Sequence, residues 1–559
     1  MINIFINTII VNLVIFSFGL VCSQTFLNEK ITKDNVYEIP LFGIIFLSFV
    51  VLIINFFFPI NKIVGSLILI FGIINIILIT YKNIHLLKKI FKNIIIASFI
   101  SYLIISFSNV YRPDAGLYHL PFISLINENK IIFGSVNINF RYATTSIIQY
   151  LSASQNNYLF DLRSISIPVA SIFSFSILFM IKQTFESLKN KENKLNTIIF
   201  LLITCYSFIS FGRFSNYGND TVSHIYFFLL IIFLVKNFDT LSLNILNFYK
   251  LSFITIFLFA TKAFMLFIMI IPLYFFIINK NKKKFFKNRT SYILTFLLLV
   301  WIFRNIIISG CVIYPIEKTC FKNLKYFDQE KTILEAKSGE AWSKDWINQK
   351  YKKLSFEEYN KEFNWFKTWR KIHLKKILEK ISPFLFFLFI IFLVMLFQKR
   401  DGNQRIDNNI KFIFLISILY SFIWFLKFPL YRYGSAFLAS TIIVLFIIIL
   451  NFLNLVPALS KLKLNLKLFI FICCFAFITK NFLRIINNID LNYNQWPDIY
   501  SEKNTNEINN FELIEQNNDS LFYFSGGKLC MYSKSPCSNF KTESLKKESF
   551  FSYNLYFKN

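Results

Sequence analysis

The sequence predicts an all-α protein that crosses a membrane many times, with about 12–14 transmembrane helices. Hydrophobic residues make up 55% of its 559 residues, whereas soluble domains hold roughly 45–50%. Apolar runs of about 18–20 residues recur along the whole chain, and a helix of that length spans the hydrocarbon core of a bilayer. The expected spans are residues 3–22, 39–58, 63–80, 91–109, 164–181, 196–212, 221–235, 251–261, 263–279, 291–308, 382–397, 412–427, 434–453 and 468–483.

The net charge of +29 constrains the class of partner. In a soluble protein such a charge would suggest nucleic acid. Here Lys and Arg cluster in short loops between apolar runs, as they do in the cytoplasmic loops of membrane proteins. We therefore expect membrane lipids as partners and exclude nucleic acid. The first run, residues 1–22, lacks a basic leading region and a small-residue cleavage site, so we expect it to remain as a membrane helix.

The basic loops also predict which side of the membrane each segment faces. We expect the cytoplasmic loops to be those at 82–92, 182–194, 280–289, 399–411 and 461–467. If successive segments alternate between the two sides of the membrane, both termini and the segments 110–163, 213–220, 309–381 and 485–559 lie outside. This alternation holds only if the apolar stretch 251–279 crosses the membrane twice. We expect two short or broken helices that turn near Lys262, because a broken helix is tolerated where it lines a cavity.

Cysteine positions support this assignment of sides. Of the eight cysteines, four lie in long polar regions that the alternation places outside. We expect two local disulfides there, Cys311–Cys320 and Cys530–Cys537, since the exterior is the oxidising side. A metal site is the competing interpretation, but none of the four histidines lies near either pair, so we expect no metal ligands among them.

Composition divides the chain into five parts. The segment after residue 485 turns polar and rich in Asn, and its Gly526-Gly527 pair among alternating aromatic residues predicts short strands with turns. We therefore expect a small β-rich appendage outside the membrane. The parts are additional N-terminal helices at 1–90, a core at 91–310 with the first exterior loop 110–163, an exterior loop at 309–381, C-terminal helices at 382–484 and the small exterior segment 485–559.

A carboxylate, Asp114, stands at the start of the first exterior loop, beside Arg112, Tyr118 and His119. At the membrane surface it could act as a general base that accepts a proton from an attacking hydroxyl; the alternative is a solvated loop aspartate. His119 is either part of this site or a hydrogen-bonding loop residue. The apolar spacing over 121–132 predicts an amphipathic helix that lies on the membrane.

Three more charged residues lie at the exterior ends of expected spans. Asp220, seven residues after Arg213, opens a span and is either a helix cap favoured by the dipole or a second carboxylate of the same cavity. Lys262 lies between two apolar halves, where a charge is expensive and indicates a functional site; the alternative is snorkelling to the interface. Arg432 starts a span and either binds a phosphate or anchors the interface.

These elements, taken in order, resemble the GT-C superfamily of glycosyltransferases, especially the branch with the aminoarabinose and protein O-mannosyl transferases. "YRPDAGLYHLP" resembles the first-loop motif of that family, and Asp114 matches its catalytic acid. The second acidic residue that usually follows is Ala115 here. "LRSISIPVASIF" resembles the start of the next span and places Arg163 on the arginine of the family.

The later motifs follow the same order. "GRFSNYGNDTVSHIYFFLL" is similar to a loop that carries Arg and then Asp, which matches Arg213 and Asp220. "FATKAFMLFIMIIP" places Lys262 on a lysine near the lipid phosphate, and "LYRYGSAFLAS" with Arg432 resembles a late segment without its prolines. Over nearly its full length the chain also resembles a family of uncharacterised bacterial membrane proteins with elements such as "DAxLYHLP" and "EAWS".

The resemblance implies a GT-C-like core and an inverting transferase in the inner membrane of a bacterium. The donor would be a sugar on a polyprenyl phosphate, and the acceptor a hydroxyl of a glycan, lipid or protein on the periplasmic face. Asp114 would be the base, while Asp220, Lys262 and Arg432 would line the donor phosphate site, with Arg112, Tyr118, His119, Arg163 and Arg213 also in contact with substrate. The lipid-linked sugar is the only co-substrate implied, and a divalent metal is left open.

Two other classes of function remain open. A transporter or flippase for lipid-linked glycans would also need interior cations, but it would not need a carboxylate at the exit of the first loop. An O-antigen polymerase or ligase acts on the same lipid-linked glycans through Arg and His of a large late loop, and 309–381 offers Arg370 and His373.

Overall fold

The computed structural model describes residues 2–82, 84–108, 113–189, 193–210, 214–215, 217–279, 282–349, 354–398, 406–456, 459–499, 511–516, 519–542 and 544–558. Ten helices in this part of the chain are long and apolar enough to cross a membrane. These are mainly α1 (Ile2–Val21), α2 (Ile39–Phe57), α3 (Lys62–Lys82), α7 (Ile167–Lys189), α9 (Asp220–Asn237), α13 (Arg289–Ser309), α17 (Lys375–Leu396), α18 (Asn408–Lys427), α19 (Tyr431–Phe452) and α20 (Leu459–Asp490).

The other expected spans are also helical. Two shorter apolar helices are α8 (Lys194–Ser210) and α10 (Ile245–Thr261), and α4 (Ile84–Ile105) has the length of a span but a basic first half. The prediction of a multi-pass helical protein is thus confirmed, while ten of the fourteen expected spans reach the length and apolarity of a membrane helix within the described residues. The hydrophobic runs decide this because helices satisfy their own backbone hydrogen bonds in lipid.

The break predicted at Lys262 is present. Helix α10 ends at Thr261, and Lys262 has an extended backbone with φ −159° and ψ 126°. A 3-10 helix, η7 (Ala263–Met269), then leads into α11 (Ile270–Ile278). The two halves of the apolar stretch therefore turn around Lys262, which restores the alternation that the basic loops require.

Contacts between loops agree with the predicted alternation. On one face, Ile60 N donates to Ile126 O at 2.9 Å, and Asn219 Nδ2 donates to Thr261 O at 3.0 Å. Both contacts join segments that the sequence places outside. On the opposite face, Lys250 pairs with Glu29 at 2.9 Å, so two segments expected on the cytoplasmic side meet there.

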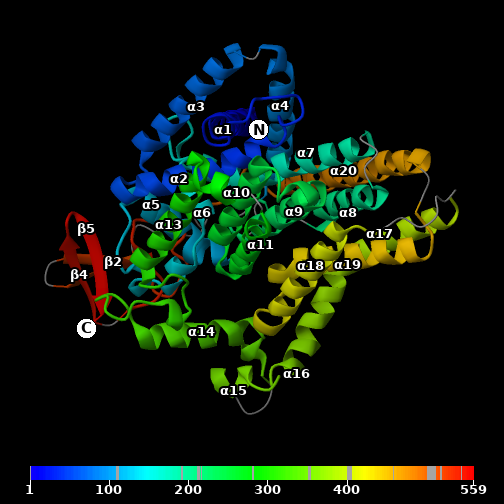
Figure 1. Cartoon of the computed structure of the whole chain (residues 1–559). Coiled ribbons are helices and arrows are strands. Elements are labelled where there is room, and N and C mark those ends of the chain that lie inside the picture. Colours follow the sequence, from blue (N-terminus) through cyan, green and yellow to red (C-terminus); the bar gives the residue numbers. More distant parts are fainter. Residues whose placement is uncertain are drawn as a thin grey trace.

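The N-terminal helices pack into the same core as the rest of the chain. Helix α1 packs against α2, α3, α4 and α7, while α2 also packs against α6 (Ile147–Ala153) and α10. Figure 1 shows α1, α2, α3 and α4 in blue at one end of the helical bundle, with the strands of the tail in red beside the segment that follows α13.

The first exterior loop is more deeply buried than expected. The predicted amphipathic helix over 121–132 forms as α5 (Leu120–Glu128), but it ends at Glu128, and its residues from Leu120 to Asn127 are all buried. Its outer side is covered by the C-terminal tail, where Asn127 Nδ2 donates to the Tyr532 hydroxyl at 3.0 Å. The expectation of a helix that lies on the membrane is therefore wrong, because a segment about 400 residues later covers it.

The tail is rich in strands, as predicted. Strand β1 (Glu512–Gln516) pairs antiparallel with β2 (Asp519–Phe524), and β2 pairs parallel with the short β3 (Cys537–Ser538). A separate hairpin consists of β4 (Leu545–Phe550) and β5 (Tyr553–Lys558). Gly526 and Gly527 follow β2 with φ of 63° and 80°, left-handed values that favour glycine in a turn.

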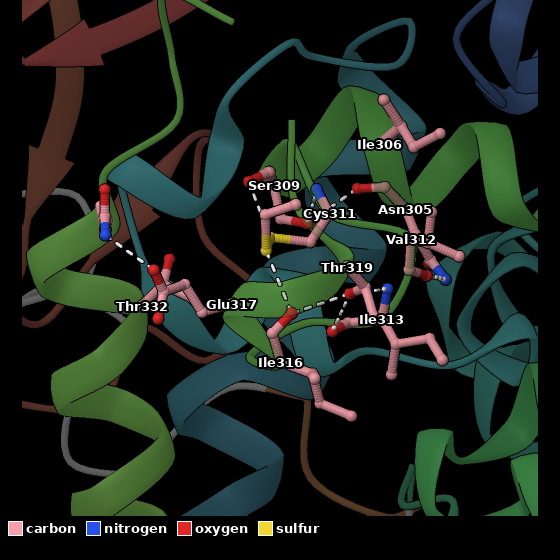
Figure 2. Close-up of a disulfide and its surroundings, with 12 residues drawn as sticks. Asn305, Ile306, Ser309, Cys311, Val312, Ile313, Ile316, Glu317, Thr319 and Thr332 are labelled. Carbon is pink, nitrogen blue, oxygen red and sulfur yellow. Dashed lines mark hydrogen bonds between the residues drawn. A yellow bond between two sulfur atoms is a disulfide. The ribbon is translucent and has the colours of Figure 1, made fainter. Parts of the chain in front are cut away.

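Both predicted disulfides form, Cys311–Cys320 and Cys530–Cys537. The first closes the segment after α13, where Asn305 Nδ2 donates to Val312 O at 3.1 Å and Thr319 Oγ1 donates to Ile316 O at 2.8 Å (Figure 2). The exterior segment continues through α14 (Gln329–Ser343), α15 (Phe356–Asn360) and α16 (Phe366–Trp369). The second disulfide fixes the part of the tail that covers α5.

Candidate functional site

Asp114 meets a partner from the far end of the chain. Its Oδ2 accepts a hydrogen bond from Arg432 Nη1 at 2.6 Å, across 318 residues of sequence. Arg432 is the second residue of α19, directly after the turn that joins α18 to α19. Two tryptophan indoles hold this turn, because Trp424 Nε1 donates to Leu430 O at 2.8 Å and Trp369 Nε1 donates to Pro429 O at 2.7 Å.

A second ion pair lies next to the first. Lys262 Nζ donates to Asp220 Oδ1 at 2.6 Å, and Asp220 Oδ2 lies 3.9 Å from Arg432 Nε. The order Lys262, Asp220, Arg432, Asp114 is therefore a continuous row of alternating charges. The start of α9 is tied to the end of α10 through Asn219, which places Asp220 opposite the helix break at Lys262.

The row becomes more exposed toward Asp114. The side chains of Lys262 and Asp220 keep 19% and 27% of their accessible surface, whereas those of Arg432 and Asp114 keep 39% and 37%. The Lys262 end therefore lies deeper in the protein, and the Asp114 end faces outward from the helical bundle. Charges that are partly removed from water interact more strongly than charges on the surface.

Tyr433 joins the two ion pairs. Its hydroxyl accepts a hydrogen bond from Arg432 Nη2 at 2.7 Å, and its ring lies 3.8 Å from Lys262 Nζ, which is within the range of a cation–π contact. His224, one helical turn after Asp220, hydrogen-bonds the backbone oxygen of Arg432 at 2.8 Å. Tyr433 is an additional site residue, and its one signal in the sequence is its place directly after Arg432 in "LYRYGSAFLAS".

His119 lies inside the protein as a hydrogen-bonding residue. Its Nδ1 is 3.0 Å from Gln149 Nε2, which also donates to Tyr217 O at 2.9 Å. Burial lowers the pKa of His119 from 6.5 to about 4, so the imidazole is neutral near pH 7. Its Nε2 faces Gly218, where a Cβ atom would lie 3.6 Å away. His119 therefore packs against the loop before α9.

Tyr118 lies between His119 and the row of charges. Burial raises the pKa of its hydroxyl, and the negative charge of Asp114 raises it further. Tyr118 is therefore a neutral hydroxyl next to the base candidate. The short helix that carries both residues, Ala115–His119, is fixed by the tail, because Met531 N donates to Gly116 O at 2.9 Å.

Comparison with known proteins places this arrangement in a family. A family model described as a domain of unknown function (DUF8201) matches residues 1–439. The chain belongs to the DUF8201 family. The matched range reaches into α19, so Asp114, Asp220, Lys262 and Arg432 all lie inside the DUF8201 domain, whereas α20 and the tail follow it. No curated protein and no solved structure matches the chain.

One site residue implied by the resemblance lies apart from the DUF8201 charge row. Arg163 is exposed in the 3-10 helix Asp161–Ser166, and within the described residues no contact joins it to Asp114 or Asp220. Its neighbour Asp161 pairs instead with Lys62 at 2.6 Å. The substrate contact expected of Arg163 stays a prediction.

Arg112 and Arg213, which the sequence also pointed to, lie outside the described residues.

The structure adds one cation, Arg141, that the sequence did not predict as a site residue. Arg141, in the 3-10 helix η4 (Phe140–Thr144) of the first exterior loop, lies within the electrostatic influence of the Asp114 carboxylate. Nothing in its sequence context, "NINFRYATT", marks it, because only the folded loop brings it under that influence.

The assembled groups can perform two kinds of chemistry. The carboxylate of Asp114 can accept a proton, and the ammonium and guanidinium of Lys262 and Arg432 can bind a phosphate. Among the described residues no group of three or more His, Cys, Asp or Glu side chains could hold a metal ion.

Proposed function

We propose that this DUF8201 protein is a GT-C type membrane glycosyltransferase that moves a sugar from a polyprenyl-phosphate donor to a hydroxyl of a glycan, lipid or protein. The observation that carries the proposal is the row Lys262, Asp220, Arg432 and Asp114, which brings together residues from four separate parts of the chain. A row that ends in an accessible carboxylate and contains two cations suits a reaction with a phosphate leaving group and a hydroxyl nucleophile.

Each group has a defined part in the proposed reaction. Lys262 and Arg432 bind the donor phosphate, for which a planar guanidinium is well shaped. The phosphate competes with Asp114 for Arg432 and so frees Asp114 Oδ2. The acceptor oxygen then attacks the anomeric carbon as its proton passes to Asp114, and the bond between that carbon and the phosphate oxygen breaks. Polyprenyl phosphate leaves, and the anomeric configuration inverts.

The position of the site agrees with a lipid-linked donor. Lys262 lies at the break between two apolar half-helices, and in the proposed function the lipid phosphate of the donor reaches it there. Broken helices at such positions expose charged and backbone groups to a cavity. We place this face on the periplasmic side of a bacterial inner membrane, because the basic loops gather on the opposite face.

The decisive experiment replaces Asp114→Asn as the only copy in the cell and compares lipid extracts with wild type. Asparagine keeps the shape and a hydrogen bond to Arg432 but cannot act as the base. We expect polyprenyl-phosphate sugar to accumulate and transfer to fall roughly 100-fold or more. The matched control is Asp161→Asn, in the same exterior loop, whose side chain pairs only with the exposed Lys62 within the described residues.

Full complementation by normally expressed Asp114→Asn would argue for a transporter or flippase, since such a protein does not need this carboxylate. The polymerase or ligase alternative depends on Arg370 and His373. In the structure Arg370 is exposed, and His373 Nε2 lies 3.7 Å from Asp345 Oδ1. Within the described residues no contact joins either residue to the charge row, so we propose the transferase.

A further inference from the structure

Arg141 is held in the first exterior loop without an acidic partner. Its guanidinium carbon lies 4.6 Å from the ring centroid of Phe140 and 5.3 Å from that of Phe540, which belongs to the C-terminal tail. Its Nη1 is buried, and within the described part of the chain it has no hydrogen-bond partner. No carboxylate among the described residues forms an ion pair with it.

The surroundings of Arg141 connect it to the charge row. Asp114 acts on it electrostatically from the first loop, and Glu335 does so from α14. Burial lowers the pKa of Arg141, and these two acids oppose that effect. Glu335 also lies within the electrostatic influence of Lys331, whose Nζ donates to Val136 O at 3.3 Å. The cluster of Arg141, Lys331 and Glu335 therefore has more cations than acids.

The charges of the inner row cancel without Arg141. Lys262 is offset by Asp220 and Arg432 by Asp114, as their contacts of 2.6 Å show. A partly desolvated guanidinium next to a neutral row is unfavourable unless an anion joins it. The rings of Phe140 and Phe540 hold the guanidinium in place, within the electrostatic influence of Asp114.

We propose that Arg141 binds a second oxyanion of the substrate, a phosphate or carboxylate, distinct from the donor phosphate at Lys262 and Arg432. The identification of this anion as part of a substrate rests on the proposed function. The anion has two possible sources. It is either a second phosphate of a diphosphate-linked donor whose first phosphate lies at Lys262 and Arg432, or an acidic group on the acceptor.

The test measures anion binding without turnover. Isothermal titration of the purified full chain in non-ionic detergent uses inorganic phosphate in one arm and pyrophosphate in the other, with no sugar donor present. The variants are Arg141→Gln and Arg141→Met; the methionine keeps the packing between Phe140 and Phe540 if glutamine destabilises the loop. Arg289→Gln, an exposed arginine at the start of α13 on the opposite face, is the matched charge control.

We expect both Arg141 variants to bind anion roughly tenfold or more weakly than wild type, since a charge-assisted contact is lost. Pyrophosphate that binds more tightly than phosphate, and is weakened also by Lys262→Met, would identify a diphosphate donor. Phosphate binding that depends on Arg141 but not on Lys262 would identify an acidic acceptor. Binding of both anions within twofold of wild type in both Arg141 variants would overturn the proposal.

The outcome is independent of the transferase test. If Asp114→Asn complements fully while Arg141→Gln loses anion binding, the anion site stands and the proposed reaction does not. If Asp114→Asn abolishes transfer while both Arg141 variants bind anions normally, the transferase stands and the second oxyanion site is refuted.

Discussion

The ion pair between Lys262 and Asp220 gives a quantitative prediction that does not depend on the substrate. Their side chains are 19% and 27% exposed, and Nζ lies 2.6 Å from Oδ1. Removal of one partner from a fully buried pair costs about 3–5 kcal/mol. Partial exposure reduces this cost, and so does Arg432, which lies 3.9 Å from Asp220. For Lys262→Met we therefore expect the free energy of unfolding to fall by about 2 kcal/mol.

The double variant tests whether this loss comes from the pair itself. Asp220→Asn leaves Lys262 above the ring of Tyr433, which compensates part of the lost attraction. In the double variant neither charge is left alone, so we expect it to be less destabilised than the sum of the single variants, by about 1–2 kcal/mol. The assay is equilibrium unfolding in mixed micelles, with all four proteins in the same detergent.

Lys62 and Asp161 provide the matched control pair. Their atoms are also 2.6 Å apart, but the side chains are 46% and 60% exposed. Exposed pairs contribute little, so Lys62→Met and Asp161→Asn should couple by less than about 0.5 kcal/mol. Equal coupling energies in the two pairs would refute the reasoning, because burial would then have no influence on the pair at Lys262.

Three further predictions concern the first loop and the tail that covers it. Gly116→Val would place a Cβ 2.4 Å from Met531 Sδ, so we expect the tail to detach and become sensitive to limited proteolysis, at a cost of about 1–3 kcal/mol. Cys530→Ser opens the loop closed with Cys537 and should lower the free energy of unfolding by about 2 kcal/mol, measured under non-reducing conditions. The lowered pKa of His119, about 4 against 6.5, means that the unfolded chain binds a proton in this window while the folded chain does not. Stability should therefore fall by about 3 kcal/mol from pH 6.5 to pH 4, and His119→Gln should remove that part of the pH dependence.

Several features were predictable because they depend on local sequence. The length of each apolar run decides whether a helix can span a bilayer, so the positions of the spans followed directly. The charge of Lys262 inside an apolar stretch predicted the helix break. The four cysteines that lie in polar regions of the sequence predicted both disulfides. The choice of Asp114 as a site residue came from its motif, and the structure gives it a cationic partner.

Other features depend on segments that are distant in sequence. The burial of α5 was missed because the chain that covers it follows about 400 residues later. Arg163 matched a family motif, but it lies on an exposed turn apart from the charge row. Arg141 carried no sequence signal at all, and its position results from packing against Phe540 of the tail.

By itself the sequence determined the membrane-length helices, the break at Lys262 and the residue types at the ends of the spans. Hydrophobic length and local charge act over tens of residues, so these properties can be read along the chain. The tertiary structure alone decided that Arg432 pairs with Asp114 and that Arg141 lies within the electrostatic influence of Asp114. Electrostatic partners are chosen by distance in space, and only the packing of the helices and the tail sets those distances.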